Sequence, residues 1–133
     1  MLAVLDTNIL VSALLSPFGP PARVLDMVLS GDLRAAFDDR LLAEYREALA
    51  RPKFSFAPED VAVVLAYLEA DGEPVTARPL PCELSNPDDL PFLEAATQAE
   101  AVLITGNTAH YPETMRGGVR VVAPGDFVRT WQK

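Results

Sequence analysis

Cysteine and histidine are almost absent from this 133-residue chain, which has one of each. The lone cysteine, Cys82, excludes an internal disulfide and a cysteine-based metal cluster, since both need more than one thiol. No run approaches the ~18 consecutive apolar residues of a membrane helix. The first residues have no basic region before an apolar one and no small-residue cleavage site, so they do not resemble a secretory signal. These absences predict a cytoplasmic protein with no membrane segment.

Basic side chains are also scarce. The chain has 11 lysines and arginines against 19 aspartates and glutamates, for a formal net charge of −8 at pH 7. Proteins that bind nucleic acid through its phosphates usually have a basic stripe, and no dense one is present here. If the ligand is a nucleic acid, bound cations, scattered arginines or a basic partner protein must supply the missing positive charge.

Half of the residues are apolar, which is enough for one core in a single domain spanning residues 1–133. Apolar runs of strand length alternate with longer stretches of helical periodicity, as in βαβ units. We therefore predict a three-layer α/β/α fold with a central, mainly parallel sheet, whose right-handed crossovers bring several strand ends to one edge. The predicted strands lie near residues 2–6, 33–37, 74–78, 101–104 and 119–122, and the helices near 8–15, 24–29, 39–50, 58–71, 90–99 and from 124 onward.

Acidic side chains recur where predicted elements begin or end. Asp6 directly follows the first strand, and Thr105-Gly106-Asn107 follows the strand near 101–104. Glu44 lies in a predicted helix, and Asp88-Asp89 precedes another. Open α/β sheets bind ligands at the carboxyl ends of their strands, and several carboxylates at one edge suit a hard cation such as Mg²⁺ or Mn²⁺. The residues themselves therefore predict a metal site.

Each acid also has a plain structural interpretation. Asp6 could cap the following helix, although the next two residues suit that role equally well. Glu44 could form a surface ion pair with Arg40, one turn away. One member of Asp88-Asp89 could cap the next helix. Periodicity leaves the role of Glu44 open, because this residue falls at the border of its helix's apolar face.

Five segments carry a resemblance to a known family. They extend along almost the whole chain, in the family's order and spacing: Leu5–Asn8, Leu42–Phe54 with Glu44, Asn86–Ala96, Leu103–Asn107 and Val122–Val128. With them the chain resembles the PIN-domain nucleases, specifically the small, VapC-like members that are toxin components of toxin–antitoxin pairs. The resemblance implies an endoribonuclease dependent on Mg²⁺ or Mn²⁺, with RNA as its substrate and an antitoxin protein as its partner.

The resemblance also implies roles for individual acids. Asp6, Glu44 and Asp89 would be the catalytic residues and would hold the metal. Asp89 is preferred to Asp88 because it stands three residues before an apolar residue and seven before a small one, as in the family's pattern. A cation held there would lower the pKa of a bound water. In-line attack on the phosphodiester would then leave a 5′-phosphate and a 3′-hydroxyl.

Asn107 departs from the family's pattern, in which many members have aspartate at this position. Its amide can offer an oxygen to a metal but brings no charge, so the number of bound metals stays open. Asn8, Asp88 and Thr105 would hydrogen-bond the ligands or add to the field of the site. His110 could contact the substrate or move a proton, or it could be an ordinary hydrogen-bonded loop residue.

Contacts to RNA have no specific signature in this sequence. Single-stranded RNA is usually held by basic groups together with aromatic stacking, and each candidate here also fits a solvated surface position. Arg46 is a candidate substrate contact. The wider set comprises the cations Arg23, Arg46, Arg51, Lys53 and Arg116 and the aromatic residues Phe18, Phe54 and Tyr111.

Two other functions stay open. Aspartate-nucleophile phosphatases also begin with a strand that ends in aspartate, but they usually have a second acid two residues later, where this chain has Asn8. A non-catalytic or weakly metal-binding module that binds RNA or a partner protein is favoured by Asn107 and by the acidic composition. Cleavage of RNA that depends on Mg²⁺ and is lost in chelator would separate the enzyme from the module.

The helix near 58–70 is apolar over more than the ~100° stripe that one core contact requires. Val63 and Tyr67 extend the apolar set beyond its main face. Small PIN proteins resemble one another in forming dimers that set two acidic sites along one groove. We therefore predict a two-fold homodimer through this helix. The alternative is that Val63 and Tyr67 cover loops of their own domain.

Overall fold

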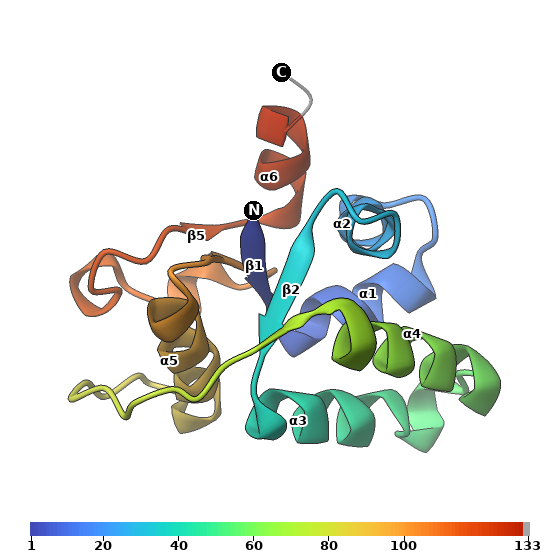
Figure 1. Cartoon of the computed structure of the whole chain (residues 1–133), viewed down its shortest axis with the longest axis horizontal. Coiled ribbons are helices and arrows are strands. Elements are labelled where there is room, and N and C mark those ends of the chain that lie inside the picture. Colours follow the sequence, from blue (N-terminus) through green and yellow to red (C-terminus); the bar gives the residue numbers. More distant parts are fainter. Residues whose placement is uncertain (132–133) are drawn as a thin grey trace.

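Five short strands form one parallel sheet in the computed structural model, which describes residues 1–131 (Figure 1). The strand order is β3-β2-β1-β4-β5, and every neighbouring pair is parallel. Ala3 of the central strand β1 is in register with Ala35 of β2 and Val102 of β4. The strands are β1 (Leu2–Leu5), β2 (Arg34–Phe37), β3 (Glu73–Pro74), β4 (Val102–Ile104) and β5 (Val121–Val122).

Helices cover both faces of this sheet. Figure 1 shows α5 on one side and α1, α2 and α4 on the other, while α3 begins at the carboxyl end of β2. The predicted three-layer α/β/α architecture with a parallel sheet is therefore confirmed. The α-helices of the described chain are α1 (Thr7–Leu15), α2 (Pro20–Leu29), α3 (Asp39–Leu49), α4 (Pro58–Asp71), α5 (Leu90–Ala99) and α6 (Pro124–Trp131).

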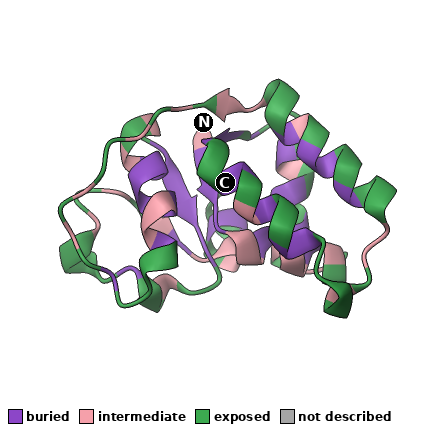
Figure 2. Ribbon diagram, turned by 90° about the horizontal axis from the view of Figure 1, so that it is seen from below, coloured by how far each residue is buried: buried purple, intermediate pink, exposed green. Residues whose placement is uncertain are grey.

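The core lies in the sheet and on the helix faces that turn toward it, as the buried (purple) segments of Figure 2 show. Val4, Leu103 and Ile104 are completely buried. A parallel sheet between two helical layers has no wet face, which explains why the central strands β1 and β4 are apolar throughout. Among residues 1–131, no helix is both long and apolar enough to cross a membrane.

Local sequence signals position the helix ends. Asp38 caps α3 by accepting a hydrogen bond of 3.1 Å from a backbone N–H of the first turn. Pro58 starts α4 and two acids follow it, which suits the positive end of the helix dipole. A Cβ at Gly72 would lie 2.4 and 2.6 Å from two carbonyl oxygens, so glycine allows the end of α4 to approach β2.

The strand predicted at 74–78 is wrong beyond its first residues. β3 covers only Glu73–Pro74, and the segment leaves the sheet after the Val75 N–H donates to the Phe37 carbonyl at 2.8 Å. Pro74 has no N–H to donate, which suits β3 to the edge of the sheet and weakens its ladder. The last strand is also shorter than predicted, since it covers Val121–Val122 and not 119–122.

Candidate functional site

The central strands β1 and β4 create the crevice in which the acids gather. The chain runs outward from β1 to β2 and β3, and then crosses back to β4 and β5. Connections from the carboxyl ends of β1 and β4 thus diverge, and such a point is where open α/β sheets bind ligands. Asp6 follows β1 and Thr105 follows β4. The Asp6 N–H donates to the Ile104 carbonyl at 3.0 Å and joins the two strand ends.

Asp6 is only 5 % exposed, and its carboxylate is held by two hydroxyl groups. Its Oδ2 accepts hydrogen bonds from Thr105 Oγ1 at 2.8 Å and from the Tyr111 hydroxyl at 3.1 Å. Asp6 has the N-cap position of α1, but its side chain makes no capping bond. The capping interpretation is therefore wrong. Both donors use the same oxygen, which leaves Oδ1 as the atom that can face a ligand.

Glu44 projects from α3 and is partly exposed. Its Oε2 accepts a hydrogen bond of 2.6 Å from the Thr7 hydroxyl at the start of α1. The alternative surface pair with Arg40 is wrong, because Arg40 instead contacts Asp38 and Glu94 at 2.7 Å each. The structure thus connects Glu44 to the residue that directly follows Asp6, across 37 positions of sequence.

Asp89 ends the short 3-10 helix η2 (Pro87–Asp89) and is 8 % exposed. Burial raises its pKa, and the charges of Asp6 and Glu44 raise it further, while His110 acts in the opposite direction. His110 Nδ1 lies 3.0 Å from Asp89 Oδ2. Glu44 also lines the same cavity as Asp89 and is bonded to Thr7, which is adjacent to Asp6, so the three acids are neighbours. The hydrogen-bonded interpretation of His110 is confirmed by its contact with Asp89.

Asn86, and neither aspartate, makes the local cap that was predicted for Asp88-Asp89. Its Oδ1 accepts from the Asp88 N–H at 3.1 Å, whereas Asp89 makes no capping bond. Asp88 itself is exposed. The reason is that Asn86 precedes the first turn, where an acceptor can reach a free N–H. Asp89 is consequently free to serve the site.

The turn after β4 is built around Asn8. The Gly106 N–H donates to Asn8 Oδ1 at 2.9 Å, and a Cβ at Gly106 would lie 3.2 Å from that same oxygen. The Asn107 N–H donates to Thr105 Oγ1 at 3.0 Å, which orients the hydroxyl toward Asp6. Asn107 is exposed, and its role as a metal ligand stays a prediction.

A cavity of about 340 Å³ opens beside Glu44 and Asp89, and Asp6 is not among its lining residues. It is lined by residues of α1, α3, the segment after α3 and η2: Thr7, Asn8, Val11, Glu44, Ala48, Arg51, Phe54, Asn86, Asp88 and Asp89. Arg46 does not line it but borders a separate, apolar cavity of about 520 Å³ between α3 and α4, where it lies 3.7 Å from Glu69. A larger cavity, about 600 Å³, lies at the opposite end of the sheet beside Met1 and Val102.

The acids suit a hard divalent cation by their chemistry, since three carboxylates from three elements converge on one sheet edge. A cation there would relieve the repulsion that contributes to the raised pKa of Asp89. Within residues 1–131, no three acidic, histidine or cysteine side chains are already arranged as a set that could hold a metal. Each carboxylate is instead hydrogen-bonded to a neighbour. Each of these hydrogen bonds uses one oxygen of its carboxylate and leaves the other as the atom that would contact an ion.

Two residues that hold the acids were missed by sequence reasoning. Thr7 was considered only as a helix cap, yet it binds Glu44. Tyr111 was considered a loop aromatic, yet it is completely buried and its pKa is raised by burial and by the charges of Asp6, Asp89 and Glu44. No local pattern indicates either contact, because the partners are far apart in sequence.

Comparison with known proteins places this geometry in context. A family model described as "PIN domain" matches residues 3–109, a stretch that contains Asp6, Glu44, Asp89 and Asn107. No curated protein shows a significant sequence match to the chain.

Several solved structures share the fold. The complex VapBC2 from Rickettsia felis, bound to a DNA fragment from its promoter, aligns with a TM-score of 0.62 at 18 % identity over 92 % of this chain and 98 % of that one. FitAcB from Neisseria gonorrhoeae aligns at 0.59 and 18 %, over 92 % and 98 % of the two chains. FitAB bound to an IR36 DNA fragment gives 0.59 and 18 %, over 92 % and 94 %. At these identities the likeness establishes the fold.

Proposed function

Because this chain belongs to the PIN domain family, we propose that it is a divalent-metal-dependent endoribonuclease and the toxin of a toxin–antitoxin pair. The observation that carries this function is that Glu44 and Asp89 line one cavity and Glu44 is bonded to Thr7, the neighbour of Asp6, at the switch point of a parallel sheet. The family match explains why these three carboxylates lie together although their charges repel one another. The whole chain, residues 1–133, acts as one domain in this proposal.

The protein's own groups prepare the site. Asp6, Glu44 and Asp89 would hold Mg²⁺ or Mn²⁺, with Asn107 as a further oxygen donor. Such a cation polarises an attacking water and neutralises charge on the phosphate. Thr105 and Tyr111 keep one oxygen of Asp6 occupied, and Thr7 does the same for Glu44. The remaining oxygens are thereby directed to the ligand, as hydrogen-bonding partners of metal ligands commonly do. The expected products carry a 5′-phosphate and a 3′-hydroxyl.

Partners follow from the same proposal. Solved structures with this fold include VapBC2 and FitAB complexes bound to DNA, and we propose a cognate antitoxin for this chain. A net charge of −8 favours a basic partner. A homodimer is supported by α4, where Val63 is 66 % exposed although it is apolar. Because cellular RNA is the proposed substrate, we place the protein in the cytoplasm.

The test is cleavage of end-labelled single-stranded RNA by the purified protein. We expect cleavage in Mg²⁺ or Mn²⁺, none in chelator, and 5′-phosphate ends on the products. The variant Asp6→Asn, purified in the same way, controls for contaminating nucleases and should be inactive. A folded protein that binds RNA without metal-dependent cleavage would be a binding module, and the nuclease proposal would then be wrong.

A further inference from the structure

We propose that Phe54, with Arg51 and Lys53 beside it, forms a subsite for one unpaired nucleotide of the substrate. The base stacks on the Phe54 ring, and a neighbouring phosphate contacts the two cations. The inference rests on the proposed nuclease function. It adds to that function the position of the nucleic acid and the reason why the nucleic acid must be single-stranded. It assigns the segment that directly follows α3 to substrate binding.

Phe54 lies beside two of the proposed catalytic acids, Glu44 and Asp89. It lines the cavity of about 340 Å³ together with Glu44 and Asp89, so a nucleotide against its ring would have a phosphate near the carboxylates. The ring belongs to the 3-10 helix η1 (Pro52–Phe54), which Pro52 begins and Ser55 ends with a left-handed φ of 54°. A proline and a tight turn limit the motion of this short segment.

The ring also has a supporting neighbour. Phe56 stacks on Phe54 with 5.4 Å between the ring centroids and 15° between the ring planes. Both residues are only partly buried, and Phe56 packs against the main core whereas Phe54 does not. A supported, partly exposed aromatic ring beside a polar cavity is the arrangement on which proteins stack unpaired bases.

The other loop aromatics do not offer this geometry. Tyr111 is completely buried and its hydroxyl is bound to Asp6, so no base can reach its ring. Phe18 is 92 % exposed in the turn between α1 and α2, but it does not line the cavity of the acids. Of the three aromatic candidates from the sequence, Phe54 alone borders that cavity.

Two cations accompany the ring in an otherwise acidic site. The Lys53 ammonium lies 5.1 Å from the centroid of Phe54. Arg51 lines the cavity and forms a pair of 2.7 Å with Glu47 on the exposed side of α3. Exposed pairs of this kind contribute little stability, so Arg51 can exchange Glu47 for a phosphate. A base stacked on the ring would similarly displace the Lys53 ammonium from Phe54. That ammonium would then contact a phosphate of the nucleic-acid backbone.

Stacking on a single ring requires a base that is not already paired and stacked in a duplex. It is also tolerant of sequence, because every base has a π-face. The subsite therefore selects single-stranded segments and gives only modest preference among bases. Alanine substitution of such a ring costs roughly tenfold in affinity.

A fluorescence reporter tests the contact directly. In Trp131→Phe/Phe54→Trp, the only tryptophan stands at the proposed stacking position, and Trp131→Phe/Phe18→Trp is the matched control. In chelator and low salt, single-stranded RNA should quench the emission of the first protein and leave that of the second unchanged, while duplex RNA quenches neither. Anisotropy of labelled RNA reports binding independently. RNA that binds without quenching, or no binding of single-stranded RNA at all, overturns the subsite.

Cleavage kinetics separate this inference from the nuclease function. Phe54→Ala should raise the KM for single-stranded RNA roughly tenfold, Phe54→Tyr should restore it, and Phe18→Ala should leave it unchanged. Metal-dependent cleavage with an unaltered KM in Phe54→Ala would show that the subsite is wrong and the nuclease function right. Quenching without any cleavage by the wild type would show the reverse. If Phe54→Ala weakens only the complex with an antitoxin, Phe54 belongs to the protein partner and the inference fails.

Discussion

At the scale of single residues, the site is defined by which oxygen of each acid is already occupied. Asp6 Oδ2 is bound by Thr105 and Tyr111, and Glu44 Oε2 by Thr7. Buried carboxylates require such donors, because an ionised group without partners is costly to bury. The same donors orient the acids, so stability and function depend on the same contacts. Three predictions follow from this arrangement.

Asp89→Asn should abolish most metal affinity and lower the cleavage rate by more than ~100-fold, since it removes a proposed ligand. It should also raise thermal stability in chelator at neutral pH. The folded pKa of Asp89 is raised by burial, Asp6 and Glu44, so wild-type stability falls as the pH rises through that pKa. The gain should therefore vanish below the ordinary aspartate pKa of 3.8, where the carboxyl group is neutral in both states.

The matched control for that experiment is Asp88→Asn, which makes the same chemical change at the adjacent, exposed position. Thermal denaturation in chelator between pH 3 and 8 and cleavage assays in Mg²⁺ provide the two measurements. Near-wild-type cleavage by Asp89→Asn, or equal losses in the two variants, would contradict the assignment of Asp89.

Tyr111→Phe should lower the free energy of unfolding by about 1.5–3 kcal/mol, because Asp6 loses a buried hydroxyl donor. The control is Tyr45→Phe, which removes a buried hydroxyl that bonds the Leu5 carbonyl and no acid. Both variants should be less stable in urea titrations. Only Tyr111→Phe should change metal affinity by calorimetry, and equal affinities in the two variants would count against the hydroxyl pair on Asp6.

Asn107→Asp should tighten the binding of Mn²⁺ or Mg²⁺ at least several-fold, because a charged oxygen would replace an amide oxygen near the acids. Calorimetric titration of both forms also gives the number of ions. If the two forms bind metal with the same affinity and stoichiometry, Asn107 lies outside the coordination sphere and does not decide how many ions bind.

At the scale of elements, the long segment between β3 and η2 is fastened to the helices by one buried acid. Glu94 of α5 accepts from the Leu80 N–H at 2.8 Å and from Arg40 at 2.7 Å. Arg40 also binds Asp38, the cap of α3. This network links α3, which carries Glu44, to α5, which directly follows Asp89, through the loop that leads to Asp89.

Glu94→Ala should destabilise the fold by about 2 kcal/mol, which is less than the loss of a fully buried pair because the Arg40 side chain is 47 % exposed. Hydrogen exchange should increase in residues 79–88 while β1 and β4 stay protected. Glu94→Gln keeps an acceptor for Leu80 and should restore much of that protection. Unchanged exchange in the loop would show that Glu94 does not fasten it.

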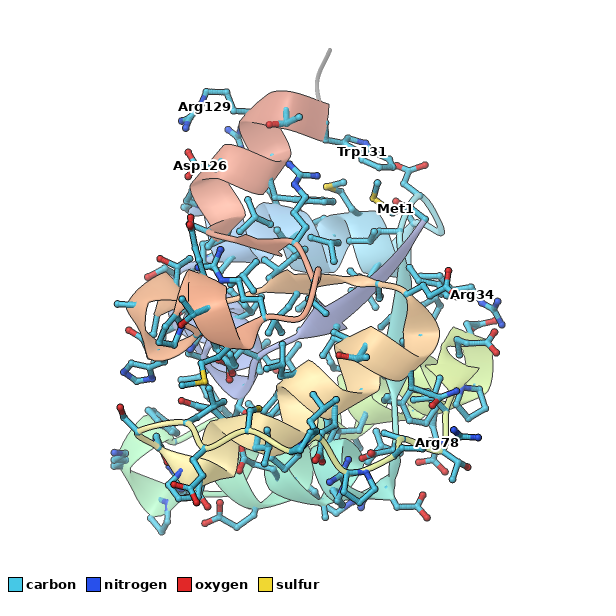
Figure 3. All side chains as sticks on the ribbon, turned by 90° about the vertical axis from the view of Figure 1, so that its left-hand side faces the viewer. Met1, Arg34, Arg78, Asp126, Arg129 and Trp131 are labelled. Carbon is cyan, nitrogen blue, oxygen red and sulfur yellow. The ribbon has the colours of Figure 1, made fainter. Side chains whose placement is uncertain are left out.

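At the scale of the whole molecule, positive charge is dispersed and not gathered into a stripe. Arg34, Arg78 and Arg129 project from separate parts of the surface (Figure 3). Arg34 is paired with Glu73 at 2.7 Å, and Arg129 is paired with Asp126. RNA binding by one copy should therefore be weak and sensitive to salt. A dimer would bring two sets of cations to one substrate.

Val63→Asp should convert the proposed dimer to a monomer, since a two-fold interface places the new charge near its own copy and like charges there cost several kcal/mol. Light scattering at micromolar concentration gives the mass. Thr76→Asp adds the same charge at an exposed loop position and should leave the dimer intact. A monomer mass for the wild type would end the dimer proposal.

The sequence by itself determined the order and type of the elements and the family. A parallel sheet buried on both faces leaves a local signature, because its central strands must be apolar throughout. The five segments that indicate the PIN domain are local as well, because each one is a contiguous stretch of sequence. The errors in the elements lie at their ends: α2 begins at Pro20 and not near residue 24, and β3 ends at Pro74 although apolar residues such as Val75 continue the strand pattern.

The tertiary structure alone decided how the acids are held and what borders them. Thr7 and Glu44 are 37 positions apart, and Asp6 and Tyr111 are 105 apart. A hydrogen bond between such residues depends on how crossovers bring strand ends together, and no periodicity in a window of sequence records it. The same holds for Phe54, whose place beside Glu44 and Asp89 follows from the turn after α3 and the packing of η2. Periodicity reports burial, whereas contact between distant residues is a property of the assembled fold.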